Sequence, residues 1–130
     1  MKIEKFEELD SWKKARELTN LIYDLTEQKG FKKDFRLYGQ VRDASGSSMH
    51  NIAEGFDAGS DAEFIRFLKI SRRSASEVQS QLYLALDRKY ITANQLQMAY
   101  DKAVEVKKLI NGLIAYLRGK KKQSHSRIVA

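Results

Sequence analysis

The apolar residues in the last third of the chain follow a seven-residue repeat, and this repeat limits the possible fold more than any other feature. They are separated by alternating steps of three and four residues: Leu96, Ala99, Ala103, Val106, Ile110, Leu113 and Leu117. Such spacing places all of them on one face of a helix, which packs against its neighbours at shallow left-handed crossing angles. We therefore expect a long helix within a bundle.

Three earlier segments show helical periodicity as well. The first runs from about Leu9 to Gln28 and is expected to end near Gly30, because glycine readily adopts the left-handed conformation that closes a helix. Asp34 is the expected N-cap of the second helix. Ser60 with Glu63, and Thr92 with Gln95, fit the capping-box pattern at the start of the third and fourth helices.

The core faces expected for the second and third helices both carry small residues at mid-length. We therefore expect these two helices to be close antiparallel neighbours. The core faces of the first three helices are Trp12, Ala15, Leu18, Ile22 and Leu25; Tyr38, Val41, Ser45, Ser48, Ile52 and Gly55; and Phe64, Leu68, Ser71, Ala75, Val78, Leu82 and Ala85.

The fold class predicted from these patterns is all-α, an antiparallel up-down-up-down four-helix bundle over residues 1–117 with connections near 29–33, 57–60 and 89–92. The absence of proline from the 130 residues supports continuous helices. Residues 118–130 are basic, lack periodicity and are expected to form a flexible tail. Several apolar residues fall outside the core faces and favour self-association: Ile65, Ile70, Tyr83, Leu84, Tyr100 and Ile114.

Several classes of protein are disfavoured by composition. The chain has no cysteine, and we identify neither a secretory signal nor an apolar run long enough to span a membrane, so we expect a cytoplasmic protein without membrane association. Bundle metalloenzymes use a Glu-x-x-His motif. Here Ser47 precedes His50 by three residues and Lys122 precedes His125. We therefore expect no metal, no cofactor and no catalytic residue.

Positive charge is the feature that suggests a ligand. The net charge is +7, of which +5 lies in the last thirteen residues. Phosphate binding by lysine and arginine requires no precise spacing. The candidate nucleic-acid-binding residues are Arg66, Lys69, Arg72, Arg73, Arg118, Lys120, Lys121, Lys122 and Arg127. The alternative is a solvated helix face, partly neutralised by Glu77, and a tail that only increases solubility.

The most distinctive string is Asn51-Ile52-Ala53-Glu54-Gly55. It is interpreted as a structural motif that sets the pairing of the second and third helices, with Glu54 as a partner for an arginine such as Arg42. The functional alternatives are a binding site, or a catalytic base formed by His50 with Glu54 one turn later.

This string carries a family resemblance, together with Gln40-Val41-Arg42, Ser48, Phe56, Glu63-Phe64, Phe67-Leu68, Ser74, Glu77, Gln81-Leu82 and Tyr90-Ile91. Residues 6–117 resemble the four-helix-bundle proteins encoded in the intervening sequences of bacterial 23S ribosomal RNA genes, often labelled S23 ribosomal proteins. The resemblance implies a ring, typically a homopentamer, with no established enzymatic activity. A related branch contains accessory proteins of diversity-generating retroelements, which bind a reverse transcriptase and its RNA.

Two departures from the family pattern affect its charges. The usual pair of arginines on the second helix is Arg42-Asp43 here, and Arg72-Arg73 adds charge to the small middle of the third helix. Local clustering of basic residues and the family resemblance together give the leading hypothesis, a non-enzymatic, ring-forming bundle that binds RNA or another polyanion through its basic residues. The alternative is a protein-interaction scaffold, or an accessory subunit of a reverse transcriptase, with no direct nucleic-acid role.

Overall fold

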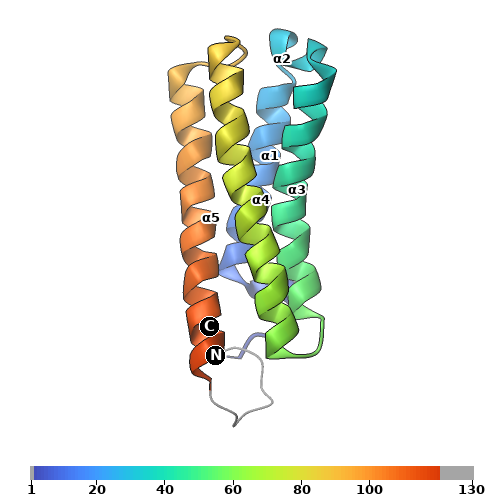
Figure 1. Ribbon diagram of the computed structural model, residues 1–130, viewed down its shortest axis with the longest axis vertical. Coiled ribbons are helices and arrows are strands. Elements are labelled where there is room, and N and C mark those ends of the chain that lie inside the picture. The colour runs from blue at the N-terminus through green and yellow to red at the C-terminus, as the bar shows by residue number, and fades with distance from the viewer. Residues whose placement is uncertain (1, 121–130) are drawn as a thin grey trace.

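The computed structural model describes residues 2–120 and contains four long helices that lie side by side (Figure 1). The elements are η1 (Phe6–Glu8), α1 (Asp10–Thr26), α2 (Lys29–Lys33), α3 (Phe35–Phe56), α4 (Asp61–Asp87) and α5 (Ala93–Gly119). Helices α1, α3, α4 and α5 run alternately up and down, and α1 begins at the end of the bundle where α5 ends. The predicted all-α bundle is confirmed.

The helix starts follow the predicted local chemistry. The Asp34 carboxylate accepts a hydrogen bond from the Leu37 amide. The Thr92 hydroxyl accepts one from the Gln95 amide, and the Gln95 side-chain oxygen accepts one from the Thr92 amide. Ser60 accepts from the Glu63 amide, as expected. The Glu63 carboxylate, however, accepts a hydrogen bond from the Arg66 guanidinium. The capping box is therefore complete at α5. At α4 the observed half of the box is the hydrogen bond from the Glu63 amide to the Ser60 hydroxyl.

The prediction for Gly30 is wrong, because it lies within the short helix α2 and does not close α1. A Cβ at Gly30 would lie 3.3 Å from the Tyr90 ring, so the glycine allows this ring to approach. The tight turn between α3 and α4 does use a left-handed glycine, Gly59, whose φ is +98°. A residue with a side chain would be strained there.

The core faces match the predicted pattern except at two positions near helix ends. Leu37 is buried in α3, whereas its neighbour Tyr38 is partly exposed. In α5, Ile114 is buried at 3% exposure, whereas Leu113 is only partly buried. In both cases the core takes the adjacent residue, because the face directed at the other helices rotates slowly along a helix with 3.6 residues per turn.

The closest pairing in the bundle is between α3 and α4. The Ser71 hydroxyl donates to the Ser48 carbonyl at 2.6 Å, and the two hydroxyl oxygens are 3.1 Å apart. Since the single proton of Ser71 is used on the carbonyl, the Ser48 hydroxyl donates to Ser71. Ser47 and Ser74 make a second hydroxyl pair at 2.9 Å. The prediction that these helices are close antiparallel neighbours is confirmed.

Gly55 lies at the narrowest point of this pairing. A Cβ there would lie 2.7 Å from Cβ of Phe67 and 2.9 Å from the ring of Phe64. Phe64 is fully buried and packs edge-to-face on Phe56 at 5.9 Å between ring centroids. Because neither contact can be relieved by moving a flexible side-chain end, the backbone of α3 would have to move away from α4.

Gly55→Ala is therefore expected to lower the free energy of unfolding by roughly 1 to 3 kcal/mol, the usual range for overpacking a core. Urea denaturation monitored by circular dichroism measures it. Gly39→Ala is the matched control in the same helix, because a Cβ there meets nothing within 4 Å. It should be neutral or stabilising by up to about 1 kcal/mol. Equal effects at both positions would contradict the close approach at Gly55.

Candidate nucleic-acid interface

A shallow depression on the outer surface between α4 and α5 is lined by basic and neutral polar side chains. Its lining residues, which we call the basic depression, are Lys69, Arg72, Arg73, Ser76, Lys107 and Asn111. The α4 residues recur at steps of three and four, so they share one face of that helix. Lys107 and Asn111 are one turn apart on α5. Two adjacent helices therefore contribute four cations to one surface.

Neutral hydrogen bonds hold two of these cations in place. Arg72 donates from Nη1 to the Asn111 side-chain oxygen at 2.7 Å. Lys107 donates from Nζ to the Gln79 oxygen at 2.7 Å and to the Ser76 hydroxyl at 3.1 Å. Gln79 is 7% exposed, so its amide is a fixed anchor. These contacts orient the cations across the α4–α5 junction without cancelling their charge.

No carboxylate lines the basic depression, and none of its four cations makes a salt bridge among residues 2–120. Elsewhere many cations are neutralised by carboxylates. Lys102, on the same helix as Lys107, lies 2.8 Å from Glu17 and 3.8 Å from Glu105. Uncompensated cations attract anions more strongly than paired ones. The depression is thus a concentrated positive surface.

On the side of α5 where Lys102 pairs with Glu17, the ion pair changes the pKa values of both groups. The hydrogen bond and charge of Lys102 hold the pKa of Glu17 below its usual range, with a smaller contribution from Lys14. The same contact with Glu17 raises the pKa of Lys102. Cations on this side are occupied by internal partners and are less available to a ligand.

Chemistry other than charge is not evident in the described part of the chain. Residues 2–120 contain no group of three or more histidine, cysteine or acidic side chains that could hold a metal ion. Within the same residues, no helix is both long and apolar enough to cross a membrane. His50 and Glu54 are both exposed on α3.

Comparison with known proteins identifies the family. The model of the 23S rRNA-intervening sequence protein family matches residues 7–112, most of the chain. The chain belongs to this family. A search of curated proteins found no match.

A solved structure shows the same fold. It is the crystal structure of a protein with unknown function from the S23 ribosomal protein family of Bacteroides thetaiotaomicron. The two chains are 28% identical with a TM-score of 0.73, and the match covers 80% of this chain and 97% of the other. The arrangement of helices is therefore that of a known family structure.

In this family member, three of the four predicted basic residues of α4 come together and one does not. Lys69, Arg72 and Arg73 line the basic depression. Arg66 instead pairs with Glu63 at 3.1 Å, and its guanidinium lies over the Phe67 ring. Sequence reasoning missed Lys107 and Asn111. They carry a weak signal, as polar residues one turn apart off the core face of α5, but pairing them with α4 requires the packed structure.

The alternative of a solvated face partly neutralised by Glu77, one turn after Arg73, would place these two side chains together, but residues 2–120 contain no salt bridge between them. Glu77 lies instead beside Asp43 and Gln81, in a separate depression between α3 and α4. The reason is the position of Glu77 on α4, which faces the side of α3, whereas Arg73 faces the side of α5.

The basic residues at the end of α5 fall into two groups. Helix α5 continues past Leu117 to Gly119, so Arg118 lies in its last turn and is exposed. Lys120 lies 2.9 Å from Asp61 at the start of α4, and its side chain is 10% exposed. Lys121, Lys122 and Arg127 lie outside the described residues.

The Asn51–Gly55 motif has structural contacts. Asn51 donates to the Ser47 carbonyl at 2.8 Å and to its hydroxyl at 3.1 Å, which supports the pair formed by Ser47 and Ser74. Ile52 is fully buried, Ala53 is partly buried and packs against the core, and Gly55 allows the approach to α4.

The suggested pairing of Glu54 with Arg42 is wrong. The Arg42 guanidinium lies 2.6 Å from Glu27 and stacks between the Tyr23 and Tyr38 rings at about 4 Å from each centroid. It also donates from Nε to Thr26 at 2.9 Å. Because Tyr23 and Thr26 lie on α1 and Glu27 is its C-cap, Arg42 fastens α3 to the end of α1.

Lys102→Met is expected to raise the pKa of Glu17 towards its ordinary value, because the hydrogen bond that favours the carboxylate is lost. The depressed pKa stabilises the fold at neutral pH, and this contribution disappears as the pH falls through the pKa of the folded state. Carbon-13 NMR titration of the side-chain carboxyl measures the change. Lys14→Met, the control, should raise the pKa less. An unchanged Glu17 pKa in Lys102→Met would contradict the assigned cause.

Proposed function

We propose that this chain is a non-enzymatic cytoplasmic protein that binds RNA through the basic depression and assembles into a ring, the pentamer implied by the family resemblance. The observation that carries the RNA proposal is the set of four cations on α4 and α5 that have no carboxylate partner within residues 2–120.

The chemistry of the depression favours the phosphate backbone over the bases. Lysine and arginine side chains neutralise phosphates, and they do so without reading sequence. None of the described residues that line the depression is aromatic, so they offer no stacking platform of the kind that proteins use for unstacked bases. The proposed ligand is therefore structured RNA, recognised by its backbone. Repeating the depression in every subunit of a ring would multiply weak contacts.

Helices α4 and α5 also supply the surface proposed for subunit contact. Tyr83 is 51% exposed, Leu84 is 49% exposed, and Met98 on α5 is 61% exposed. They lie where α4 ends and α5 begins, away from the basic depression along the helices. Exposed apolar groups of this size favour association with another protein surface. The same surface would serve a partner protein under the alternative, in which the chain is a scaffold or a reverse-transcriptase accessory subunit.

RNA binding is tested by filter binding of a structured RNA over a salt series. The variant Lys69→Gln/Arg73→Gln/Lys107→Gln removes three cations of the depression, and the glutamine at position 107 keeps a hydrogen-bond donor. Each lost phosphate contact should reduce the slope of log K against log salt by about 0.7 to 0.9, so the expected total is about 2 to 3. The midpoint of thermal unfolding, measured in parallel, verifies that the variant is folded.

The matched control is Lys13→Gln/Lys29→Gln/Arg88→Gln, which removes the same charge from exposed residues of α1, α2 and the end of α4. This control variant should keep most of the slope of log K against log salt that the unmodified chain shows. A chain ending at Lys120 measures the share of Lys121, Lys122 and Arg127. Equal loss of binding in the two triple variants would show that net charge matters and the depression does not. Similar affinity for heparin would make the ligand a general polyanion.

Assembly is tested by light scattering. Tyr83→Glu/Leu84→Glu should lower the molar mass of the assembly, because charge on the proposed contact surface must be desolvated on association. The control is Asn20→Glu/Gln40→Glu, which adds the same charge at exposed polar positions of α1 and α3. If the oligomer persists in the control but not in Tyr83→Glu/Leu84→Glu, the result supports the proposed subunit contact. An unchanged mass in both variants would place the contact elsewhere, and a monomeric unmodified chain would remove the ring.

A further inference from the structure

Two hydrogen bonds cross the basic depression in opposite directions. Arg72 reaches from α4 to the side-chain oxygen of Asn111 at 2.7 Å. Lys107 reaches from α5 to the hydroxyl oxygen of Ser76 at 3.1 Å. The two donors and acceptors on each helix are four residues apart, which is about one turn. These two cross-links therefore lie about 6 Å apart along the helices.

The hydrogens that remain in the depression are available to a ligand. Both side-chain oxygens in the cross-links already accept a hydrogen bond from a cation. Within residues 2–120, the amide nitrogen of Asn111 and the hydroxyl of Ser76 donate no hydrogen bond, although both residues are exposed. Lys69 and Arg73 are exposed beside them and make no hydrogen bond or salt bridge in the same part of the chain. The depression therefore presents mainly donors.

Such a lining selects a ligand whose surface consists of acceptors. Phosphate oxygens have this character, whereas the edges of base pairs combine acceptors with donors or methyl groups. Two donors that each lie about 2.8 Å from oxygens of one phosphate can be about 6 Å apart. This separation matches the spacing of the two cross-links, so a single phosphate can contact both of them.

The amount of positive charge favours a terminal phosphate over a phosphate inside the backbone. Each backbone phosphate is a diester with a single negative charge. A phosphate monoester carries about −1.5 to −2 at pH 7 and offers three strong acceptor oxygens. The depression combines four cations with the neutral donors of Asn111 and Ser76. It can therefore compensate the larger charge and bind the third oxygen.

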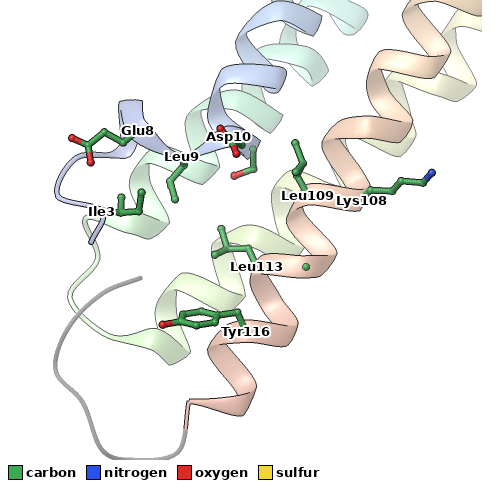
Figure 2. A pocket seen from close by; sticks show the side chains of 10 residues that line it. Ile3, Glu8, Leu9, Asp10, Lys108, Leu109, Leu113 and Tyr116 are labelled. Carbon is green, nitrogen blue, oxygen red and sulfur yellow. The ribbon is translucent and has the colours of Figure 1, made fainter. Parts of the chain in front are cut away.

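An apolar groove beside the second half of α5 has a different character. Lys108 lines this groove, but its side chain points away from it (Figure 2). An anion that leaves water needs hydrogen bonds and opposite charge in return, and apolar walls supply neither. The groove is therefore unsuited to a phosphate. Its apolar lining residues are Ile3, Leu9, Leu109, Leu113 and Tyr116.

We propose that the basic depression binds the terminal phosphate of an RNA strand. The monoester lies between the two cross-links, surrounded by the four cations, and accepts hydrogen bonds from the Asn111 amide and the Ser76 hydroxyl. This inference rests on the proposed RNA binding and narrows it to the end of the strand. Asn111 is the residue that most sharply distinguishes this site from a patch of positive charge, because its contribution is a neutral donor.

Filter binding of one RNA stem–loop prepared with different ends tests the inference. The three forms carry a 5′-phosphate, a 3′-phosphate or hydroxyl groups at both ends. One of the phosphorylated forms should bind about tenfold more tightly than the hydroxyl form, the effect of roughly one hydrogen bond to a charged group. Equal affinity for all three forms would overturn the terminal phosphate but leave RNA binding in place. Binding of none of them would remove the proposed function itself.

A single substitution shows whether the preference arises in the depression. Asn111→Asp replaces the N–H donors by a carboxylate that pairs with Arg72, so the preference should fall from about tenfold to about twofold or less. Thermal unfolding verifies that the variant is folded. A preference that persists in Asn111→Asp would overturn the assigned site, because it would reflect only the added charge of the RNA.

The matched control is Asn94→Asp. Asn94 is exposed in the first turn of α5, where a carboxylate is favourable for the helix. It lies about 25 Å from Asn111 along the helix. The control makes the same chemical change away from the depression and should keep the preference for the phosphorylated RNA. Equal loss of the preference in both variants would contradict the assigned site.

Competition with inorganic phosphate distinguishes an RNA end from free phosphate. The competitor is added to the complex with the phosphorylated stem–loop at constant ionic strength. Displacement should require a large molar excess, because the RNA places further phosphates near basic residues. Equal affinity for inorganic phosphate and for the phosphorylated RNA would identify free phosphate as the ligand and would overturn the proposal.

Discussion

The approach of α3 to α4 through small side chains determines how the rest of the bundle is arranged. Hydroxyl groups replace bulky side chains along the middle of this contact, and every hydroxyl at its centre is bonded to another serine or to the backbone. A serine pair without these bonds would bury unsatisfied polar atoms, which is unfavourable. Gly55 continues the contact to the end of α3, where Phe64 and Phe67 occupy the space that a side chain would need.

This close pairing has a consequence for the other faces of α4. The middle of α4 uses serine and alanine against α3, whereas Arg72 and Arg73 lie towards α5. Arg72 donates to the Asn111 amide oxygen there. On the α1 side of α5, by contrast, Lys102 meets Glu17 and Glu105. The two sides of one helix thus differ in free positive charge, although the body of the chain is nearly neutral by composition.

Periodicity and capping could be predicted because they depend on residues close in the sequence. Asp34, Ser60 and Thr92 cap the helices that follow them, and the buried face of α4 contains all seven predicted residues. The errors occur where another helix decides the outcome. Gly30 is adjacent to Tyr90, sixty residues later, and Ile114 replaces Leu113 in the core because of the rotation of α5 against its neighbours.

The same division between local and long-range contacts applies to what the sequence could predict of the candidate site. The sequence by itself determined an all-α bundle and the close pairing of two helices with small centres, and it proposed four cations of α4 as binding residues, Arg66 among them, because a helix places residues three and four apart side by side. Only the tertiary structure decided which cations keep a carboxylate partner. Arg42 finds Glu27, Lys102 finds Glu17, and Lys107 finds Gln79 on another helix. Such pairs depend on the register and rotation of packed helices, which are set by the fit of side chains across the whole core.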